Sequence, residues 1–203
     1  MGVRTKTREL LTRIINRKHF DECFVQWESL YGDFDKSNYT EFTINNLPNE
    51  SRLCHGEIIK WSSDISPKRV LLAGDNISAA ARLKNIINAG EVLTAGLSNA
   101  DYIWNFEQDV PAIPCKFDLI VSQAIFEHLM NPYKHLQDLS KLLQIKGHII
   151  IHTVMPGFQY HRYPIDSFRF FPDWFEECAK RFDLIVIKRR IKGTHIFYMY
   201  QKK

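Results

Sequence analysis

From residue 68 onward, short continuous apolar runs alternate with stretches in which apolar residues recur every three or four positions. The continuous runs, at 69–73, 91–97 and 117–122, are typical of strands buried on both faces of a sheet. The spaced stretches, at 77–89 and 132–143, predict amphipathic helices. Because strands alternate with helices, the pattern predicts an α/β fold with a mostly parallel, Rossmann-like sheet.

Beyond residue 143 the pattern predicts a strand, a loop, a helix and two further strands, at 147–154, 155–171, 172–181, 182–190 and 194–201. The last two strands flank Lys192-Gly193, so they are expected to form a C-terminal antiparallel hairpin. A short strand at 102–105 follows the strand before it too closely for a crossover helix. The sheet is therefore expected to lack one crossover helix in its middle part and to end in an antiparallel pair of strands.

The N-terminal part of the chain has a different character. Residues 7–31 have apolar positions at helical spacing, and the first 18 residues carry six basic side chains and one acidic one. This helix could contact a partner or a membrane surface, but docking on its own domain is favoured because core helices show the same pattern. Residues 31–50 are polar and are expected to form a loop. We expect an N-terminal helical cap segment over 1–67 and a second domain over 68–203.

The composition suits one well-buried domain. Of the 203 residues, 45% are hydrophobic, and a net charge of +4 is too small to indicate nucleic-acid binding. The four cysteines lie far apart without a CxxC pair, so neither a zinc knuckle nor a disulfide framework is expected. No apolar run reaches the length of about 18 residues that a membrane span needs. These features favour free thiols and a soluble, cytoplasmic protein.

Polar residues stand where the predicted strands end, and in open α/β sheets this edge binds the ligand. The strand at 117–122 is followed by Glu127-His128, and the strand at 69–73 by the turn Gly74-Asp75-Asn76. Against the dinucleotide fingerprint G-x-G-x-x-G, this turn keeps only the first glycine, and the side chain of Asn76 fills space that a pyrophosphate needs. A dinucleotide is therefore disfavoured, whereas a ligand without phosphates is allowed.

Two further groups of side chains are expected to be structural. His148 and His152 share one side of a predicted strand, but no acid or cysteine is placed to complete a metal site, so no metal is expected. Basic residues gather around the hairpin turn, at Lys188, Arg189, Arg190 and Lys192. They match no nucleic-acid motif and are expected to be solvated.

Two blocks of sequence resemble the class I S-adenosylmethionine-dependent methyltransferases. The block FDLIVSQAIFEHLMNP at 117–132 resembles that family's central-strand motif. The block YPIDSFRFFPDWF at 163–175 resembles the P-x-D-x-x-R-F-x-P segment of members that act on glycans and small molecules. With the glycine turn and the hairpin, the resemblance covers 68–201. It implies a Rossmann-like methyltransferase fold, S-adenosylmethionine as cofactor, and a small-molecule or glycan acceptor, with a sugar or other hydroxyl favoured.

The resemblance also implies which residues hold the cofactor. They are Gly74, Asp75 and Asn76 at the methionine part, Ser98 at the ribose, Asn105 and Phe106 at the adenine, and Ser122, Gln123 and Ala124 near the transferred methyl. This chain has one glycine in the turn, and Ser98 and Asn105 where the family usually has acids. Because each loss removes about 1 kcal/mol or more of hydrogen bonding, a catalytically inactive binding or scaffold domain is the alternative function.

The long loop at 155–171 is rich in aromatic and charged residues and is a candidate lid over the acceptor. The candidate acceptor-binding residues are Tyr160, His161, Tyr163 and Arg169. A hydroxyl acceptor benefits from a general base, and the candidates by location are His128, His161 and Asp166. Each has a structural alternative: His128 can bond a backbone carbonyl, His161 can be a surface residue of the lid, and Asp166 can form an ion pair with Arg169 that shapes the loop.

Overall fold

The computed structural model describes residues 22–23, 25–32, 35–36 and 50–203. The chain divides into two compact units, Met1–Phe34 and Asp35–Lys203. In the first unit, residues 22–23 and 25–31 are helical, and the remainder of the helix predicted at 7–31 lies outside the described residues. None of the described helices combines the length and the apolar character that crossing a membrane requires.

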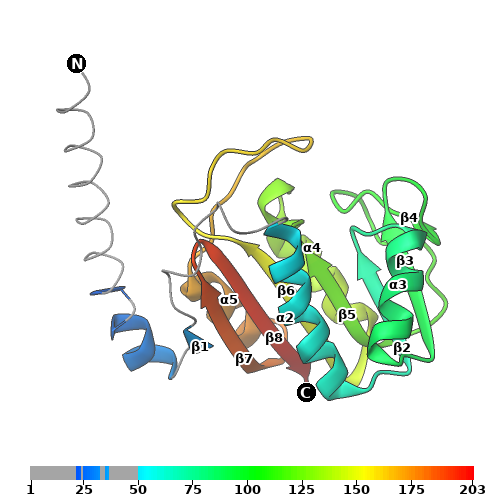
Figure 1. The fold of residues 1–203 in the computed structure, drawn as a ribbon, viewed down its shortest axis with the longest axis horizontal. Coiled ribbons are helices and arrows are strands. Elements are labelled where there is room, and N and C mark those ends of the chain that lie inside the picture. The colour runs from blue at the N-terminus through cyan, green and yellow to red at the C-terminus, as the bar shows by residue number, and fades with distance from the viewer. Residues whose placement is uncertain (1–21, 24, 33–34, 37–49) are drawn as a thin grey trace. The chain divides into compact units, whose positions relative to one another are not determined.

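The described residues of the second unit form an eight-stranded sheet with the order β1-β7-β8-β6-β5-β2-β3-β4 (Figure 1). Its strands are β1 (Asp35–Lys36), β2 (Arg69–Ala73), β3 (Glu91–Gly96), β4 (Tyr102–Ile103), β5 (Phe117–Gln123), β6 (Leu143–Val154), β7 (Leu184–Lys192) and β8 (His195–Lys202). All neighbouring strands are parallel except that β8 runs antiparallel to β6 and β7. The predicted mostly parallel sheet with a C-terminal antiparallel hairpin is confirmed.

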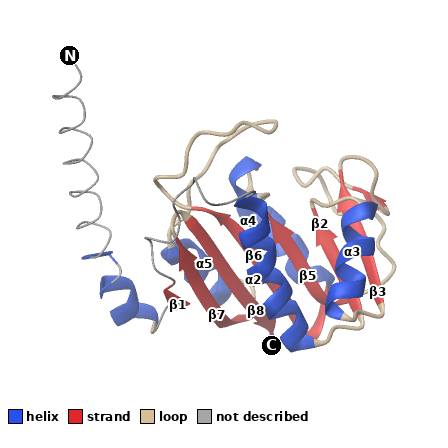
Figure 2. Ribbon diagram, viewed as in Figure 1, coloured by secondary structure: helices blue, strands red, loops and turns tan. Residues whose placement is uncertain are grey.

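Helices cover both faces of the sheet (Figure 2). The helices α2 (Glu50–Ile65) and α3 (Ile77–Ile87) lie on one face, and α4 (Pro132–Leu142) and α5 (Pro172–Arg181) on the other. On the first face, Ile58 and Trp61 of α2 join one buried cluster with alternate residues of the central strands, such as Val70 and Leu72. On the second face, Leu136 and Leu139 of α4 are buried, as their helical spacing predicts. The site is thus supported by a core on either side of the sheet.

The start of α3 shows why the turn after β2 does not suit a phosphate. Asn76 is the N-cap, and its side-chain oxygen accepts the N–H of Ala79 at 3.1 Å. The N–H of Ile77 is bonded to the carbonyl oxygen of Asn99 at 3.1 Å. Because these helix N-terminal amides already have partners, they are not available to a pyrophosphate. The prediction that Asn76 obstructs a dinucleotide is consistent with this geometry.

Some boundaries differ from the predicted ones. The two-residue strand β1 lies within the segment 31–50 that was expected to be a loop, and it is too short to leave a pattern in the sequence. The strand β6 begins at Leu143 rather than at residue 147. Its early part includes Gly147, where a Cβ would lie 2.9 Å from the carbonyl oxygens of Gln144 and Phe117. This close approach requires glycine, which explains why the start of the strand looks like a turn in the sequence.

The basic residues of the hairpin are paired, and the expectation that they are merely solvated is wrong. Arg189 donates through Nη2 to Oε2 of Glu176 in α5 at 3.1 Å. Arg190 forms an ion pair with Glu57 in α2. Both carboxylate side chains are buried, so their charges need these partners. The hairpin is therefore held to helices on both faces of the sheet.

His135 of α4 is fully buried beneath the carboxyl end of β5. Its ring lies 4.5 Å from that of Phe106 and 5.2 Å from that of Phe126, centroid to centroid, and its Nε2 is 3.4 Å from Oγ of Ser122. Burial lowers the pKa of His135 from 6.5 to about 3. The imidazole is therefore neutral in the folded protein at ordinary pH.

We expect the stability of the protein to fall as the pH falls below about 6.5, because the unfolded chain then protonates His135 and the folded protein does not. The loss approaches about 1.4 kcal/mol per pH unit for this single group. Urea unfolding at pH 7.5, 6.5, 5.5 and 4.5 measures it. The variant His135→Phe keeps an aromatic ring in this position and should show a shallower pH dependence. An unchanged slope in the variant would contradict the assignment.

Candidate functional site

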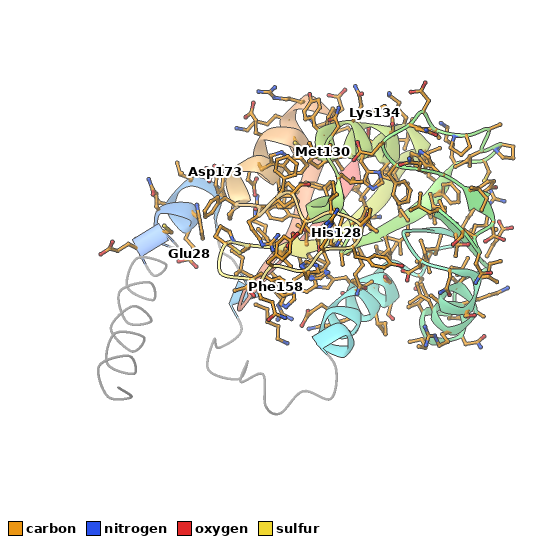
Figure 3. All side chains as sticks on the ribbon, turned by 90° about the horizontal axis from the view of Figure 1, so that it is seen from above. Glu28, His128, Met130, Lys134, Phe158 and Asp173 are labelled. Carbon is orange, nitrogen blue, oxygen red and sulfur yellow. The ribbon has the colours of Figure 1, made fainter. Side chains whose placement is uncertain are left out.

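The candidate site lies at the carboxyl edge of the sheet, where the order of the strands reverses. The strand β2 pairs with β3 on one side and with β5 on the other, so the loops after β2 and β5 leave in different directions. After β5, Ala124 takes a left-handed conformation (φ 52°) and donates its N–H to the carbonyl of His152 at 2.9 Å. This turn leads into the single-turn helix η3 (Phe126–His128). Figure 3 views the edge from above, with His128 among its side chains.

Glu127 is a fully buried acid at this edge. Its Oε2 accepts the hydroxyl of Thr153, the residue before the last of β6, at 2.6 Å. Its Oε1 has no hydrogen-bond partner among the residues that the structure describes. A buried carboxylate oxygen without a partner is unfavourable, so such an atom marks a position where a proton, a cation or a ligand is expected.

Two imidazoles face the open oxygen of Glu127. Nε2 of His161 is 3.7 Å from Oε1, and Nε2 of His128 is 3.9 Å from it. The two rings meet edge to face, with centroids 4.8 Å apart. Nδ1 of His128 lies 2.5 Å from the carbonyl oxygen of Ile165, so Nδ1 carries the proton and Nε2 presents its lone pair when the ring is neutral. We call Glu127, His128 and His161 the acid–histidine cluster.

The loop 155–171 is shaped by one ion pair. Nη2 of Arg169 donates to Oδ2 of Asp166 at 2.7 Å, and a second bond joins Nη1 to Oδ1. The same carboxylate accepts the N–H of His161 at 2.7 Å. The bonds from Arg169 hold the pKa of Asp166 well below its usual range. The expected ion pair is therefore present, and Asp166 fixes the position of His161.

At the β2 side of the edge, Ile125 lies directly on Gly74. Gly74 has φ 101°, and a Cβ built on it would be 2.2 Å from Cδ1 of Ile125. Among the described residues outside its own turn, no other side chain comes within 4 Å of that position. The backbone N–H of Gly74 is bonded to the carbonyl of Ala95 at 2.8 Å. The positive φ favours glycine here, and the Ile125 side chain occupies the space beside its Cα.

No family model and no curated protein matches this chain. Several solved structures have a similar fold. The CcbJ methyltransferase from Streptomyces caelestis superposes with a TM-score of 0.61 and 10% identity, over 78% of this chain and 100% of that one. The N-methyltransferase NodS from Bradyrhizobium japonicum WM9, in complex with S-adenosyl-L-homocysteine, gives 0.56 and 13%, over 79% and 91%. An O-methyltransferase family protein from Burkholderia thailandensis gives 0.58 and 8%, and this chain spans 74% of its own length and 56% of that chain.

This is the class I methyltransferase fold. The three superpositions cover 74% to 79% of this chain with TM-scores of 0.56 to 0.61. At these identities the likeness concerns the fold, so the chemistry has to be argued from the residues of this chain.

Within the methyltransferase fold, the predicted cofactor residues follow four neighbouring strands. Gly74 follows β2, Ser98 follows β3, Asn105 follows β4, and Gln123 ends β5. Ser98 and Asn105 are exposed, and the side-chain oxygen of Asn105 accepts the N–H of Glu107 at 3.1 Å. Two of the predicted residues have buried side chains instead, namely Phe106 in the aromatic group around His135 and Ser122 beside it. They support the floor of this edge from within the core.

On the acceptor side, the structure brings four predicted residues together and leaves two apart. His128, His161, Asp166 and Arg169 form one connected group with Glu127. Tyr160 and Tyr163 are 73% and 83% exposed and do not join this group.

Two residues that shape the site were not singled out from the sequence. Thr153 is one, and its signal was a polar residue near the end of a mostly apolar strand. Ile125 is the other, and nothing in the sequence distinguishes it from the other apolar residues at 117–132. Both act through contacts with residues distant in the sequence.

We expect Asp166→Asn to loosen the loop 155–171, because the amide keeps the size of the carboxylate but loses the charge-assisted bonds to Arg169. Hydrogen exchange of the backbone amides in the loop should become faster, while exchange in β5 and β6 stays the same. A matched control is Glu177→Gln, which removes an exposed carboxylate bonded to Arg181 at 3.0 Å and should change little. Equal exchange in the loop of the wild-type protein and Asp166→Asn would contradict the anchoring role.

Proposed function

We propose that this protein transfers a methyl group from S-adenosylmethionine to a small-molecule or sugar acceptor, with a hydroxyl as the favoured acceptor. The observation that carries the proposal is the open Oε1 of buried Glu127, which faces two imidazoles at the carboxyl edge of a methyltransferase fold. Burying an acid with an unsatisfied oxygen lowers stability. A fold kept only as a scaffold gains nothing from such a group, whereas an acceptor site does.

S-adenosylmethionine supplies a methyl group on a sulfonium, so the protein has mainly to align acceptor, methyl and sulfur. Gly74 and Asp75 would flank the methionine part, Ser98 the ribose, and Asn105 the adenine. Gln123 and Ala124 would lie nearest the methyl group. The residues present suit a cofactor without phosphates, because the amides at the start of α3 are already bonded.

Removal of the acceptor proton is assigned to the acid–histidine cluster. The bond from Nδ1 of His128 to the carbonyl of Ile165 leaves Nε2 as the atom that faces Glu127. His161 is one-third exposed, so it is the member that an acceptor can reach from solvent. Asp166 is committed to Arg169 and to the backbone of His161, so we assign it the positioning of His161 rather than proton removal.

The acceptor would enter beneath the loop 155–171. Figure 1 shows this loop extending beyond the carboxyl ends of β5 and β6. The ring centroids of Phe158 and His161 are 5.0 Å apart, and Cζ of Arg169 lies 5.8 Å from the centroid of Phe158. Tyr160 and Tyr163 are candidates to contact the outer part of the acceptor, because planar rings suit sugars and other small molecules.

The cellular location and the partners of the protein are also proposals. The structure has free thiols at Cys23, Cys115 and Cys178, which suits a reducing cytoplasm. Nothing in the described surface suggests nucleic acid, since basic residues of the hairpin are paired with acids. Contact of the basic N-terminal helix with a partner or a membrane surface stays a prediction.

A second candidate is a catalytically inactive binding or scaffold domain. Ile125 favours it, because its side chain occupies the space in front of Gly74 along which the methionine part of the cofactor would run. The replacement of two acids by Ser98 and Asn105 acts in the same direction. The two candidates differ in whether cofactor binds and whether methylated product forms.

Calorimetric titration of the full-length protein with S-adenosylmethionine and S-adenosylhomocysteine tests the proposal. We expect saturable binding with a Kd between about 1 μM and 1 mM, the range usual for enzyme substrates. Ser98→Asp restores an acceptor for the ribose hydroxyls and should tighten binding about tenfold. No heat and no thermal stabilisation at millimolar cofactor would refute the proposal. Binding without product from any hydroxyl acceptor would favour the second candidate.

We expect Ile125→Ala to tighten cofactor binding several-fold, because it removes the atoms that lie against Gly74. The control is Ile145→Ala, which removes the same atoms at a position that is 73% exposed and away from the edge. The same titration measures both. Weaker binding in Ile125→Ala would show instead that Ile125 packs on the cofactor.

A further inference from the structure

The acid–histidine cluster has the composition of a transition-metal site. It offers one carboxylate oxygen and two imidazole nitrogens, a set that suits Zn²⁺ and related divalent ions rather than Mg²⁺ or Ca²⁺, which prefer oxygen. One ligand atom from each of Glu127, His128 and His161 lies within 4.8 Å of the other two. Three protein ligands leave at least one position open, as in catalytic metal sites.

The distances within the cluster fit an ion better than direct hydrogen bonds. Oε1 of Glu127 is 3.7 Å from Nε2 of His161 and 3.9 Å from Nε2 of His128, and both separations are too long for a hydrogen bond. With metal–ligand bonds of about 2.0–2.2 Å, neighbouring ligand atoms lie roughly 3–3.5 Å apart. A contraction of about half an ångström brings the two distances from Oε1 to that spacing, and the two imidazole nitrogens, which lie within 4.8 Å of each other, approach by up to about 1.3 Å through side-chain rotation.

Two of the three ligands, His128 and Glu127, are also held by a hydrogen bond on the side away from the cluster, which is the usual arrangement around a bound metal. Nδ1 of His128 lies 2.5 Å from the carbonyl oxygen of Ile165. Nδ1 of His161 lies 3.6 Å from Oδ2 of Asp166, and Oε2 of Glu127 accepts the hydroxyl of Thr153. The hydrogen bonds turn Nε2 of His128 and Oε1 of Glu127 toward the cluster, and His161 is held there through its backbone N–H, which Asp166 accepts at 2.7 Å.

The charge around this point favours a cation. Glu127 and Asp166 are acids, and Arg169 is the basic residue beside them, but its guanidinium is committed to Asp166 and to the carbonyl of Gln159 at 3.1 Å. Oε1 of Glu127, on a side chain with no exposed surface, has no hydrogen-bond partner among the residues described. The unsatisfied oxygen is therefore aimed into the cluster and lacks the positive partner that its burial calls for.

We propose that Glu127, His128 and His161 bind a single divalent transition-metal ion, with Zn²⁺ preferred over Mg²⁺, and leave a coordination position open toward the acceptor. The binding of the ion stands on the geometry of the cluster alone. Its use in holding the acceptor hydroxyl rests on the proposed methyl transfer. With the ion bound, both Nε2 lone pairs would be bonded to it, so the ion would lower the pKa of the hydroxyl in place of proton removal by an imidazole.

Untagged full-length protein, stripped with chelator and free of cofactor, is titrated with ZnCl₂ by calorimetry. We expect one equivalent to bind and the midpoint of thermal unfolding to rise by about 5 °C at saturating ion. CoCl₂ should bind at the same place and give visible absorption bands typical of a nitrogen–oxygen site. MgCl₂ should bind at least about 100-fold more weakly.

Variants show whether the ion binds at the cluster. Glu127→Gln keeps the acceptor for Thr153, and His161→Gln changes a partly exposed side chain, so both should fold, which circular dichroism checks. Each should weaken Zn²⁺ binding about 100-fold or more and remove the Co²⁺ bands. The control is His148→Gln, a histidine of β6 bonded to Gln201 at 3.2 Å and outside the cluster, and it should bind Zn²⁺ as the wild type does.

The possible results separate the two proposals. No stoichiometric Zn²⁺ binding, equal binding of Mg²⁺, or unchanged affinity in both Glu127→Gln and His161→Gln overturns the metal site. Zn²⁺ binding that follows the variants supports it, even when S-adenosylmethionine produces no heat in a parallel titration. In that case the proposal of a metal site is supported and the proposal of methyl transfer is refuted.

Discussion

Glu127 holds three segments of the chain together at the carboxyl edge of the sheet. Its side chain accepts the hydroxyl of Thr153 from β6, and its backbone carbonyl accepts the N–H of Ser167 at 2.8 Å from the long loop. Its own position is fixed by η3, which follows β5. Glu127 thus links η3, which carries His128, to the long loop, which carries His161 and in which Asp166 holds the His161 backbone. Burying this acid is unfavourable, but its bonds to Thr153 and Ser167 assemble the site.

The carboxyl edge of the sheet carries fewer ordered polar side chains after β2, β3 and β4 than after β5 and β6. Around β2, β3 and β4 the residues predicted to bind cofactor include the exposed Ser98 and Asn105, and Gly74 is covered by Ile125. Around β5 and β6 the polar groups are dense, and most are held from two directions. The ordered polar groups of the site are therefore concentrated on the β5 and β6 side of the edge.

The sequence was sufficient for most of the sheet, because buried parallel strands such as β2 and β5 are continuous apolar runs and the hairpin has a marked turn. It was sufficient for the pair Asp166–Arg169, whose spacing is local. It could not give the contact of Ile125 with Gly74 or of Thr153 with Glu127, because these depend on the register between distant segments. The hairpin charges were misjudged for the same reason, since their partners Glu57 and Glu176 lie on helices elsewhere in the chain.

The long loop between β6 and α5 begins and ends at nearly the same place. The N–H of Met155 is bonded to the carbonyl of Thr194 at 2.8 Å, and the N–H of Phe170 to the carbonyl of Val154 at 3.0 Å. With both ends closed on the sheet, the entropy of closing the loop grows only slowly with its length. Insertions or replacements between these two anchors therefore leave the sheet and Glu127 in place. This loop can diversify as an exchangeable segment, independently of the core that supports it.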